Sequence, residues 1–524
     1  MSRTAAALFL VLAPVAFGLA AAFALGMDAN WDLRNYHYYN AYAFLAGREG
    51  YDLLAAQANT FFNPLLDLPF YLAANAWPAR LVGFLLGAAQ GLNVVPLYFI
   101  ACSTLRIERT PTKRLAAAGL ALFGLLGAGF LSELGTTFGD TLVTLGPLAS
   151  LWIVLARFDP IARGDLGAAW PRLLVAGATA GIAAGLKQPA ATYAVGLCLG
   201  FLLVPTTAPR RLGLASLFGV GVLAGFAASD GFWLWHLWRA YGNPLMPFEN
   251  QIFRSPWALP EAYRQYFDLS SGFWTRVFFP FAYLLDPKLT SEAPFFDLRL
   301  LLCLVAIPAA TAASLWRRDR GIEVPPRTRY FLASLAFGYI AWVWLFAVYR
   351  YFIAGEMLAP LALVLALDLA PLDARARRIL LAAFFVLIAA TTRPPDWIRV
   401  KWSGKWVTAE VPTLAEPART IVLITGHEPL SYLIPSFPPA VRFLRIHSGF
   451  TNPTETGVRF NAEMERIVAA HRGPIMILFN PNETVFAEKY LPYYGLAIAR
   501  AGCKPVPSDI GYLAYSLCPL ARVR

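Results

Sequence analysis

Long apolar runs separated by short polar segments follow one another along most of the chain. A run of roughly 17–25 apolar residues can cross about 30 Å of hydrocarbon as a helix. The pattern predicts about eleven transmembrane helices, over residues 5–25, 81–104, 115–131, 141–156, 172–186, 189–205, 213–235, 298–316, 330–348, 354–370 and 378–392. The chain is therefore expected to be an α-helical, multi-pass membrane protein.

Basic residues are concentrated in alternate polar segments. They are Arg3; Arg106, Arg109, Lys113 and Arg114; Arg157, Arg163 and Arg172; Arg210 and Arg211; Arg317, Arg318, Arg320, Arg327 and Arg329; Arg375, Arg377 and Arg378. Because cytoplasmic loops are rich in Lys and Arg, this alternation predicts a cytoplasmic N-terminus. Loops 26–80 and 236–297 are then expected outside. A cleaved signal peptide is the alternative for the first run, but its length favours an uncleaved helix.

The pattern changes near residue 393. Short apolar runs such as 421–424 and 475–479 alternate with Pro, Gly and Asn, and residues 462–470 have a helical pattern. These features predict a transmembrane domain over 1–392 and a small α/β domain over 393–524 on the outer side. Cys503 and Cys518 lie in the second domain, and a disulfide between them would indicate an oxidising compartment. The spacing alone leaves that pairing open.

Composition excludes several classes of protein. The chain is 58% hydrophobic and 15% charged, with a mean hydropathy of +0.52, which argues against a soluble globular protein. The net charge of +12 could indicate nucleic-acid binding, but cytoplasmic loops account for the positions of the arginines. We therefore expect a lipid bilayer as partner and no nucleic acid. No P-loop, GxSxG or HExxH motif is present.

The first outer loop contains an unusual polar and aromatic stretch, WDLRNYHYYNAYAFLAGR, over residues 31–48. Apolar positions in 33–46 recur at helical spacing and predict an amphipathic helix in the membrane interface. Asp32 is a candidate catalytic carboxylate or an N-cap of that helix. Asp28 is a second candidate, or a solvated loop acid. His37 is a candidate substrate-binding residue, or a structural one.

Other ionisable residues fall at the predicted outer ends of the helices, where burial is costly and indicates function. They are Glu133, Asp140, Lys187, Asp230, His236, Arg350 and Glu356. Asp140 could instead cap the helix that follows it. Lys187 and Arg350 are isolated cations in outer loops with few basic residues, so they suit a phosphate group. Their alternative is snorkelling to lipid headgroups.

This arrangement resembles the GT-C membrane glycosyltransferases, which include protein O-mannosyltransferases, oligosaccharyltransferase catalytic subunits and bacterial aminoarabinose transferases. The stretches WDLRNYHYYNAYAFLAGR, FFNPLLDLPFY, GLKQPA, YGNPLMPF and YRYFIAGE are similar to bacterial membrane proteins classed as GT-C-like. The resemblance covers most of residues 1–392 and not the C-terminal domain. It implies a multi-pass protein of the bacterial inner membrane with a periplasmic C-terminal domain.

The resemblance also implies roles for individual residues. Asp32, or its neighbour Asp28, would act on the acceptor as a base, and Asp140, or its rival Glu133, would be a second acid. Lys187 and Arg350 would contact the lipid-linked phosphate, and His37 and Glu356 are further candidates for substrate binding. The adjacent acidic pair of some members is absent. No cofactor is therefore assigned, and a divalent metal is left open.

The leading functional hypothesis is sugar transfer from a polyprenyl-phosphate donor to a glycan, lipid or protein acceptor of the cell envelope, on the periplasmic side. The alternative is a transporter or flippase for a lipid-linked envelope precursor. Transporters more often show repeated halves, and this sequence shows no such symmetry. A non-catalytic assembly or sensor protein is a third hypothesis.

Overall fold

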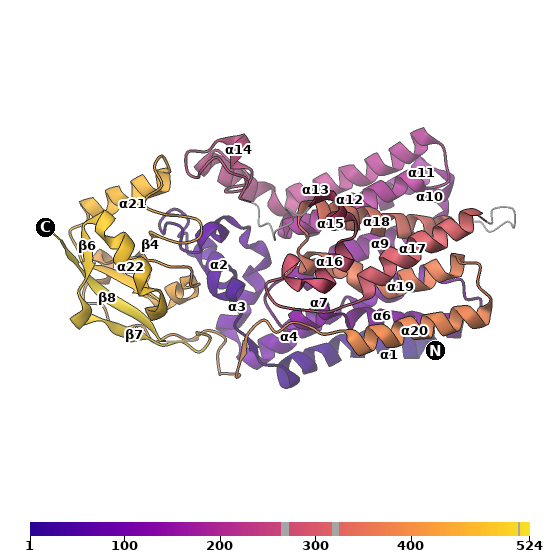
Figure 1. Ribbon diagram of the computed structural model, residues 1–524, viewed down its shortest axis with the longest axis horizontal. Helices are drawn as coiled ribbons and strands as arrows, with labels where there is room; N and C mark the ends of the chain where they lie inside the picture. The colour runs from indigo at the N-terminus through magenta and orange to yellow at the C-terminus, as the bar shows by residue number, and fades with distance from the viewer. Residues whose placement is uncertain (264–271, 317–323, 512–513, 524) are drawn as a thin grey trace.

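A helical bundle and a sheet domain form the two ends of the molecule (Figure 1). The computed structural model describes residues 1–263, 272–316, 324–511 and 514–523. Helices α2 (Tyr38–Leu45) and α3 (Leu68–Ala76) lie between the two ends. The N-terminus lies at the end of the bundle that faces away from the sheet domain. Part of the predicted first outer loop therefore lies between the bundle and the sheet domain.

The bundle contains all of the predicted apolar runs as helices. Its helices are α1 (Arg3–Leu19), α4 (Ala79–Gly91), α5 (Val94–Thr104), α6 (Thr110–Leu125), α7 (Ala128–Glu133), α8 (Asp140–Val143), α9 (Leu145–Ala156), α10 (Asp159–Arg163), α11 (Leu166–Leu186), α12 (Ala191–Gly200), α13 (Ala208–Tyr241), α15 (Gly272–Val277), α16 (Phe279–Leu285), α17 (Arg299–Trp316), α18 (Pro326–Leu345), α19 (Ile353–Leu369) and α20 (Ala374–Thr391). The short helix α14 (Asn250–Phe253) lies apart from them.

Among the described residues, five helical segments are long and apolar enough to cross a membrane, so the predicted count of about eleven is not confirmed. They are Arg3–Ala24, Ala79–Thr104, Leu166–Leu186, Ala208–Tyr241 and Tyr349–Leu369. Several other runs form helices that are too short, because turns interrupt them. Run 115–131 is divided between α6 and α7, and run 141–156 between α8 and α9. The membrane-protein prediction is retained at this coarser level.

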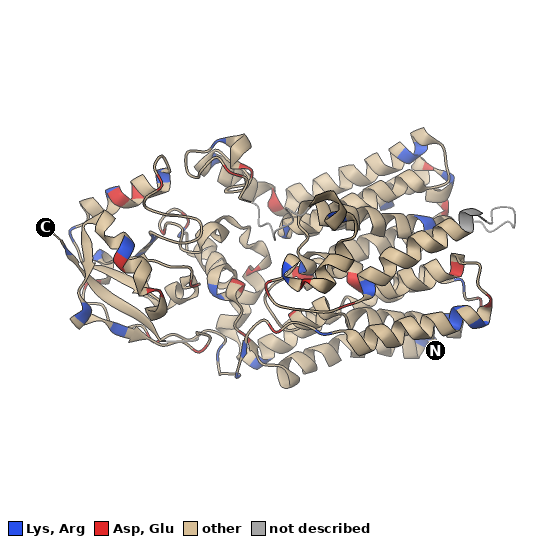
Figure 2. Ribbon diagram, viewed as in Figure 1, with Lys and Arg blue, Asp and Glu red and all other residues tan. Residues whose placement is uncertain are grey.

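Side-chain exposure and charge on the bundle agree with an apolar surrounding. Large apolar side chains point outward, including Val11, Leu223 and Val386, each more than 60% exposed. Lys and Arg cluster at the helix ends farthest from the sheet domain, and long stretches of helix carry no charge (Figure 2). The predicted loop residues Arg317, Arg318 and Arg320 lie outside the described residues.

Helices α11 and α13 pack closely because small residues line their contact. A Cβ atom at Gly177 would overlap the carbonyl oxygen of Phe218, and one at Gly181 would overlap that of Val222. Glycines at this spacing allow helix backbones to approach within a membrane. Helix α13 continues to Tyr241, so the predicted outer loop 236–297 begins later than expected.

The C-terminal domain contains a six-stranded sheet, which confirms the small α/β domain. Its strands are β3 (Ile421–Ile424), β4 (Arg442–Arg445), β5 (Ile475–Phe479), β6 (Leu496–Ile498), β7 (Lys504–Val506) and β8 (Tyr515–Arg522), with helices α21 (Arg459–Ala470) and α22 (Thr484–Tyr490). The order is β4-β3-β5-β8-β6, and β7 also pairs with β8. Strand β3 is parallel to β4 and β5, whereas β8 is antiparallel to its partners.

A disulfide joins Cys503 to Cys518, the pairing that the sequence left open. It links the segment before β7 to β8.

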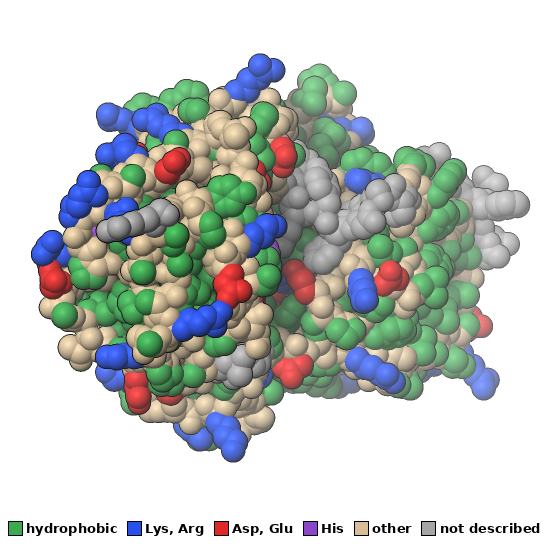
Figure 3. All heavy atoms as spheres, turned by 60° about the vertical axis from the view of Figure 1, so that its left-hand side comes forward, with side chains coloured by type: hydrophobic (Ala, Val, Ile, Leu, Met, Phe, Trp, Pro, Cys, Tyr) green, Lys and Arg blue, Asp and Glu red, His purple; other side chains and the backbone are tan. Residues whose placement is uncertain are grey.

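The surface of this domain carries scattered Lys and Arg side chains, whereas the part of the bundle visible beside it is largely hydrophobic (Figure 3).

The first outer loop packs against the C-terminal domain, which corrects the prediction for residues 33–46. This segment forms the π-type helix η2 (Leu33–His37) followed by α2, and most of its polar and apolar side chains are buried. Arg34 pairs with Glu428 at 2.6 Å, and Ser431 donates a hydrogen bond to the carbonyl of Asn35. An interfacial helix would keep its polar face in water. Here the sheet domain covers that face instead.

Candidate functional site

Four of the predicted site residues form one charged cluster between the first outer loop and the bundle. Asp32 Oδ2 lies 2.8 Å from Arg350 Nη1, which lies 3.7 Å from Asp140 Oδ2. Lys187 Nζ lies 2.8 Å from the same Asp140 oxygen. The cluster thus alternates two carboxylates with two cations, and it brings together positions more than 300 residues apart in the sequence.

Each member of the cluster stands at an element boundary. Asp32 directly precedes η2, and Asp140 is the first residue of α8. Lys187 is the C-cap of α11, and Arg350 belongs to the 3₁₀ turn η9 (Tyr349–Phe352) before α19. Boundary residues can direct side chains away from the helix axis. Four separate elements therefore place their charged groups in one space.

Aromatic rings and a backbone carbonyl fix the two cations. The Arg350 guanidinium lies 4.7 Å from the ring centroid of Phe138 and 5.3 Å from that of Tyr351. Lys187 donates a hydrogen bond of 2.6 Å to the carbonyl of Phe138. Such cation–π contacts strengthen when the site is desolvated. The side chains of Asp32, Arg350 and Lys187 remain 11–13% exposed, so the cluster is shielded and still accessible.

Asp32 is ionised and does not cap a helix. Burial raises the pKa of its carboxyl, but Arg350, His37 and Lys187 together lower the pKa more strongly, so that it lies below the usual 3.8. The residue has helical backbone angles and makes no side-chain capping bond. The N-cap alternative is therefore wrong, and the carboxylate forms an ion pair with Arg350.

His37 lies next to Asp32 and is oriented by a residue that the sequence reasoning missed. His37 Nδ1 lies 2.7 Å from Asp67 Oδ1, and both side chains are buried. Nε2 of the same ring has no hydrogen-bond partner within the described part of the chain. The sequence signal for Asp67 was a single acid within the apolar loop FFNPLLDLPFY. An oriented imidazole beside Asp32 fits a substrate-contacting role as well as a structural one.

Glu133 lies behind Asp140 and is fully buried. One carboxyl oxygen accepts a hydrogen bond of 3.2 Å from the Thr141 amide, and the other has no partner within the described residues. Burial and then the Asp140 carboxylate raise the pKa of Glu133 well above its usual 4.5. Burial and the neighbouring carboxylate both favour the neutral form of Glu133, which lies as a support behind Asp140.

Glu133→Gln is expected to preserve stability near neutral pH and to reduce the loss of stability on alkalinisation. The folded protein retains the Glu133 proton, whereas the unfolded chain releases it near 4.5, so this contribution is present below pH 4.5 and is lost as pH rises through the folded pKa. Thermal unfolding of the purified chain between pH 5 and 9 measures the effect. The exposed Glu108→Gln is the control. A variant with the pH dependence of the wild type contradicts this assignment.

Asp28 does not join the cluster, and it is not the solvated loop acid that the sequence left as an alternative. It is fully buried, and its oxygens accept hydrogen bonds from the amides and side chains of Asn30 and Thr137. Burial raises its pKa above 3.8. Strand β1 (Met27–Asp28) pairs with β2 (Arg399–Val400). Asp28 therefore joins the first outer loop to residue 137.

Glu356 does not join the cluster, and its carboxyl lies at the start of α7 instead. Its carboxyl accepts hydrogen bonds from the amides of Gly129 and Phe130 at the start of α7. Those groups are unpaired donors of a helix N-terminus, which carries partial positive charge. Glu356 is fully buried beside Asp297 and Arg299, which form an ion pair of 2.8 Å. Glu356, Asp297 and Arg299 thus form a second buried charged network, at the start of α7.

The cluster lacks the features of a metal centre. Within residues 1–263, 272–316, 324–511 and 514–523, no group of three or more His, Cys, Asp and Glu side chains is arranged to hold a metal ion. Asp32 and Asp140 are both paired with cations instead. The residues of the cluster therefore do not fit a divalent ion in this arrangement.

The charged cluster is the candidate site on geometric grounds, because the comparisons with known proteins add no relative from which a role could be transferred. No protein-family model and no curated protein sequence matches the chain.

Proposed function

We propose that the protein is a membrane glycosyltransferase that moves a sugar from a polyprenyl-phosphate donor to an acceptor of the cell envelope. The observation that carries this proposal is the cluster in which Lys187 and Arg350 alternate with Asp32 and Asp140. Two cations suit a phosphate leaving group, and a nearby ionised carboxylate suits an acceptor hydroxyl. The resemblance to GT-C enzymes led to the same pairing of roles.

An apolar cavity beside the cluster supports a lipid-linked donor. It measures about 390 Å³ including its open side and is lined mainly by apolar residues of α9, α12, α18 and α19. Tyr193 lines it and donates a hydrogen bond of 2.9 Å to the carbonyl of Tyr351, the residue after Arg350. A hydrocarbon chain in this cavity would bring its phosphate end near the two cations. A soluble nucleotide sugar has no hydrocarbon chain to place in such a cavity.

The proposed reaction is a direct displacement. The acceptor O–H gives its proton to the Asp32 carboxylate, and the acceptor oxygen forms a bond to the anomeric carbon as that carbon's bond to the phosphate oxygen breaks. The electron pair of the broken bond leaves with the polyprenyl phosphate, whose charge Arg350 and Lys187 stabilise. Because donor phosphate would compete with Asp32 for Arg350, its binding would release the carboxylate for the acceptor. The configuration at the anomeric carbon inverts.

We also propose a location in the bacterial inner membrane with the C-terminal domain in the periplasm. The Cys503–Cys518 disulfide supports an oxidising compartment for that domain. The Lys- and Arg-rich helix ends lie at the opposite end of the bundle, as expected for the cytoplasmic side.

The test is transfer by the purified full chain in lipid vesicles, with radiolabelled polyprenyl-phosphate sugars and envelope extracts as acceptors. Lys187→Gln is expected to raise the KM for the donor by about 10- to 100-fold, because a charged hydrogen bond is worth about 1.5–3 kcal/mol. The exposed Lys288→Gln is the control and should leave KM unchanged.

Two results would contradict the proposal. One is the absence of transfer to every acceptor while donor binding is retained. The other is movement of the intact labelled lipid between leaflets without sugar transfer, which would favour the transporter hypothesis.

A further inference from the structure

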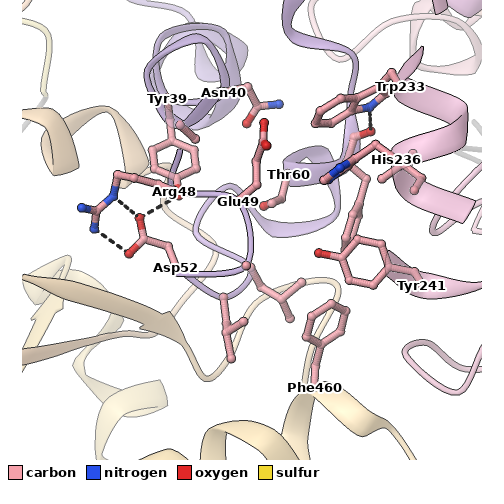
Figure 4. A pocket seen from close by; sticks show the side chains of 16 residues that line it. Tyr39, Asn40, Arg48, Glu49, Asp52, Thr60, Trp233, His236, Tyr241 and Phe460 are labelled. Atoms are coloured by element: carbon pink, nitrogen blue, oxygen red, sulfur yellow. Dashed lines mark hydrogen bonds and ion pairs between the residues drawn. The ribbon is translucent and has the colours of Figure 1, made fainter. Parts of the chain in front are cut away.

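A second cavity lies outside the charged cluster, where three parts of the chain meet (Figure 4). The first outer loop, the outer end of α13 and helix α21 of the C-terminal domain line it. Its empty volume, including the open mouth, is about 520 Å³. The cavity brings polar and apolar side chains from these three parts to one open space.

Hydrogen-bond acceptors without partners face this cavity. Asn40 is 5% exposed, and its side-chain nitrogen donates to the carbonyl of Asn59 at 2.8 Å. Its Oδ1 has no partner among the described residues. The carboxyl of Glu49 extends toward Asn40 and makes no ion pair with any residue that the structure describes. A buried acceptor without a donor is costly, so the Asn40 oxygen favours a ligand that donates hydrogen bonds. The exposed Glu49 carboxylate beside it can accept a further hydrogen bond from the same ligand.

The outer end of α13 adds two more polar groups. The ring of His236 and the hydroxyl of Tyr241 point into the cavity, and both side chains are only partly buried. His236 stacks on Trp233 with ring centroids 5.0 Å apart. Trp233 is itself fixed by a hydrogen bond of 2.8 Å from its ring nitrogen to the carbonyl of Phe61. These groups are held in place before any ligand binds.

The positive charge at the cavity is already neutralised. Arg48 forms two hydrogen bonds of 2.7 Å with Asp52 and also donates to the carbonyls of Pro439 and Val441. No lysine lines the cavity. An anionic ligand would therefore meet the Glu49 carboxylate without a free cation to offset it. This separates the second cavity from the charged cluster, where Lys187 and Arg350 are present.

The walls of the cavity are apolar. Phe61, Leu237 and Phe460 line it between the polar groups. A saccharide has both kinds of surface, with hydroxyl donors at its edges and C–H groups on its faces. From this complementarity we propose that the cavity is a binding site for a neutral saccharide.

An amine is the main competing ligand, since a carboxylate and aromatic rings can also hold a cation. The unpartnered Asn40 oxygen and the Tyr241 hydroxyl add directional hydrogen bonds that a quaternary amine would not satisfy. The saccharide is therefore the better match.

The position of this site relates it to the charged cluster without depending on sugar transfer. Asn40 lies three residues after His37, about 4.5 Å along a helix. Saccharide binding would thus occur next to the segment that carries Asp32. The inference would hold for a transferase, a transporter or a sensor.

Binding is tested by titration calorimetry on the full chain in nanodiscs, with glucose, mannose, N-acetylglucosamine and maltose as probes. At least one probe is expected to bind, and Glu49→Ala and Asn40→Ala are each expected to weaken it at least about tenfold. Glu49 is exposed, so its substitution is compatible with folding. The exposed Glu416→Gln should leave the affinity unchanged, and so should Asp32→Asn in the charged cluster.

The outcomes separate the hypotheses. Loss of binding in Glu49→Ala with retention in Asp32→Asn supports the second site, whether or not transfer is found. No binding of any probe, or equal binding by Glu49→Ala and wild type, overturns it. Tight binding of choline, with no binding of the four sugars, would assign the cavity to an amine and also overturns it.

Discussion

Replacing Asp32 by asparagine is expected to reduce the proposed sugar transfer by about 10²- to 10⁴-fold, the usual contribution of a positioned base. Asparagine has nearly the same shape but cannot take a proton. The kcat should fall, whereas the KM for the donor should stay the same or decrease, because Arg350 loses a competing carboxylate 2.8 Å away. Initial rates at varied donor concentration measure both constants.

Two variants make this result specific. Asp509→Asn removes an exposed carboxylate of the C-terminal domain and should not change the rate. Asp140→Asn should mainly raise the KM, because Asp140 holds Lys187 in position. If Asp140→Asn lowers kcat while Asp32→Asn retains it, the base is Asp140 and the assignment of Asp32 is wrong.

Arg299→Leu is expected to lower the free energy of unfolding by about 3–5 kcal/mol, since it removes one partner of a buried ion pair. Arg299 is 1% exposed and pairs with Asp297, which is fully buried. It also donates hydrogen bonds to the carbonyls of Phe123 and Leu126 at the end of α6. The substitution leaves the Asp297 carboxylate and the two carbonyls without this donor. Denaturant unfolding of the purified chain in detergent measures the loss.

The control is Arg375→Leu, at an exposed position near the start of α20, with an expected change within about 0.5 kcal/mol. A double variant that also carries Asp297→Leu should lose less than the sum of the two single variants, because the unpaired charge disappears. Equal stability of Arg299→Leu and wild type would show that the pair contributes nothing.

The sequence was most informative where the physical signal is local. Apolar runs predicted the bundle helices, and the change of pattern near residue 393 predicted the sheet domain. Lys187 and Arg350 were identified as isolated cations in loops with few basic residues. Asp32 and Asp140 were identified as acids close to the predicted outer ends of the helices. The structure brings these four together through Arg350 Nη1 and Asp140 Oδ2.

The sequence was less informative where burial depends on distant partners. Asp28 and Glu356 were predicted as site residues from their positions near the outer helix ends. In the structure, the carboxyl of each accepts hydrogen bonds from residues that are distant in the sequence. Asp67 was missed because its contact with His37, 30 positions earlier, forms only in the folded chain. The prediction of an interfacial helix over 33–46 was wrong. Periodicity indicates one apolar face of a helix but gives no information about a domain that covers its polar face.

The contact between the first outer loop and the sheet domain also affects the order of events during biosynthesis. Arg34 donates to Glu428 and Tyr515, and β1 pairs with β2 far along the chain. The segment that carries Asp32 emerges early, yet the residues that enclose it are synthesised last. The bundle can therefore insert into the bilayer well before the charged cluster acquires its final surroundings. A ribosome-bound, membrane-inserted chain would hold no completed site.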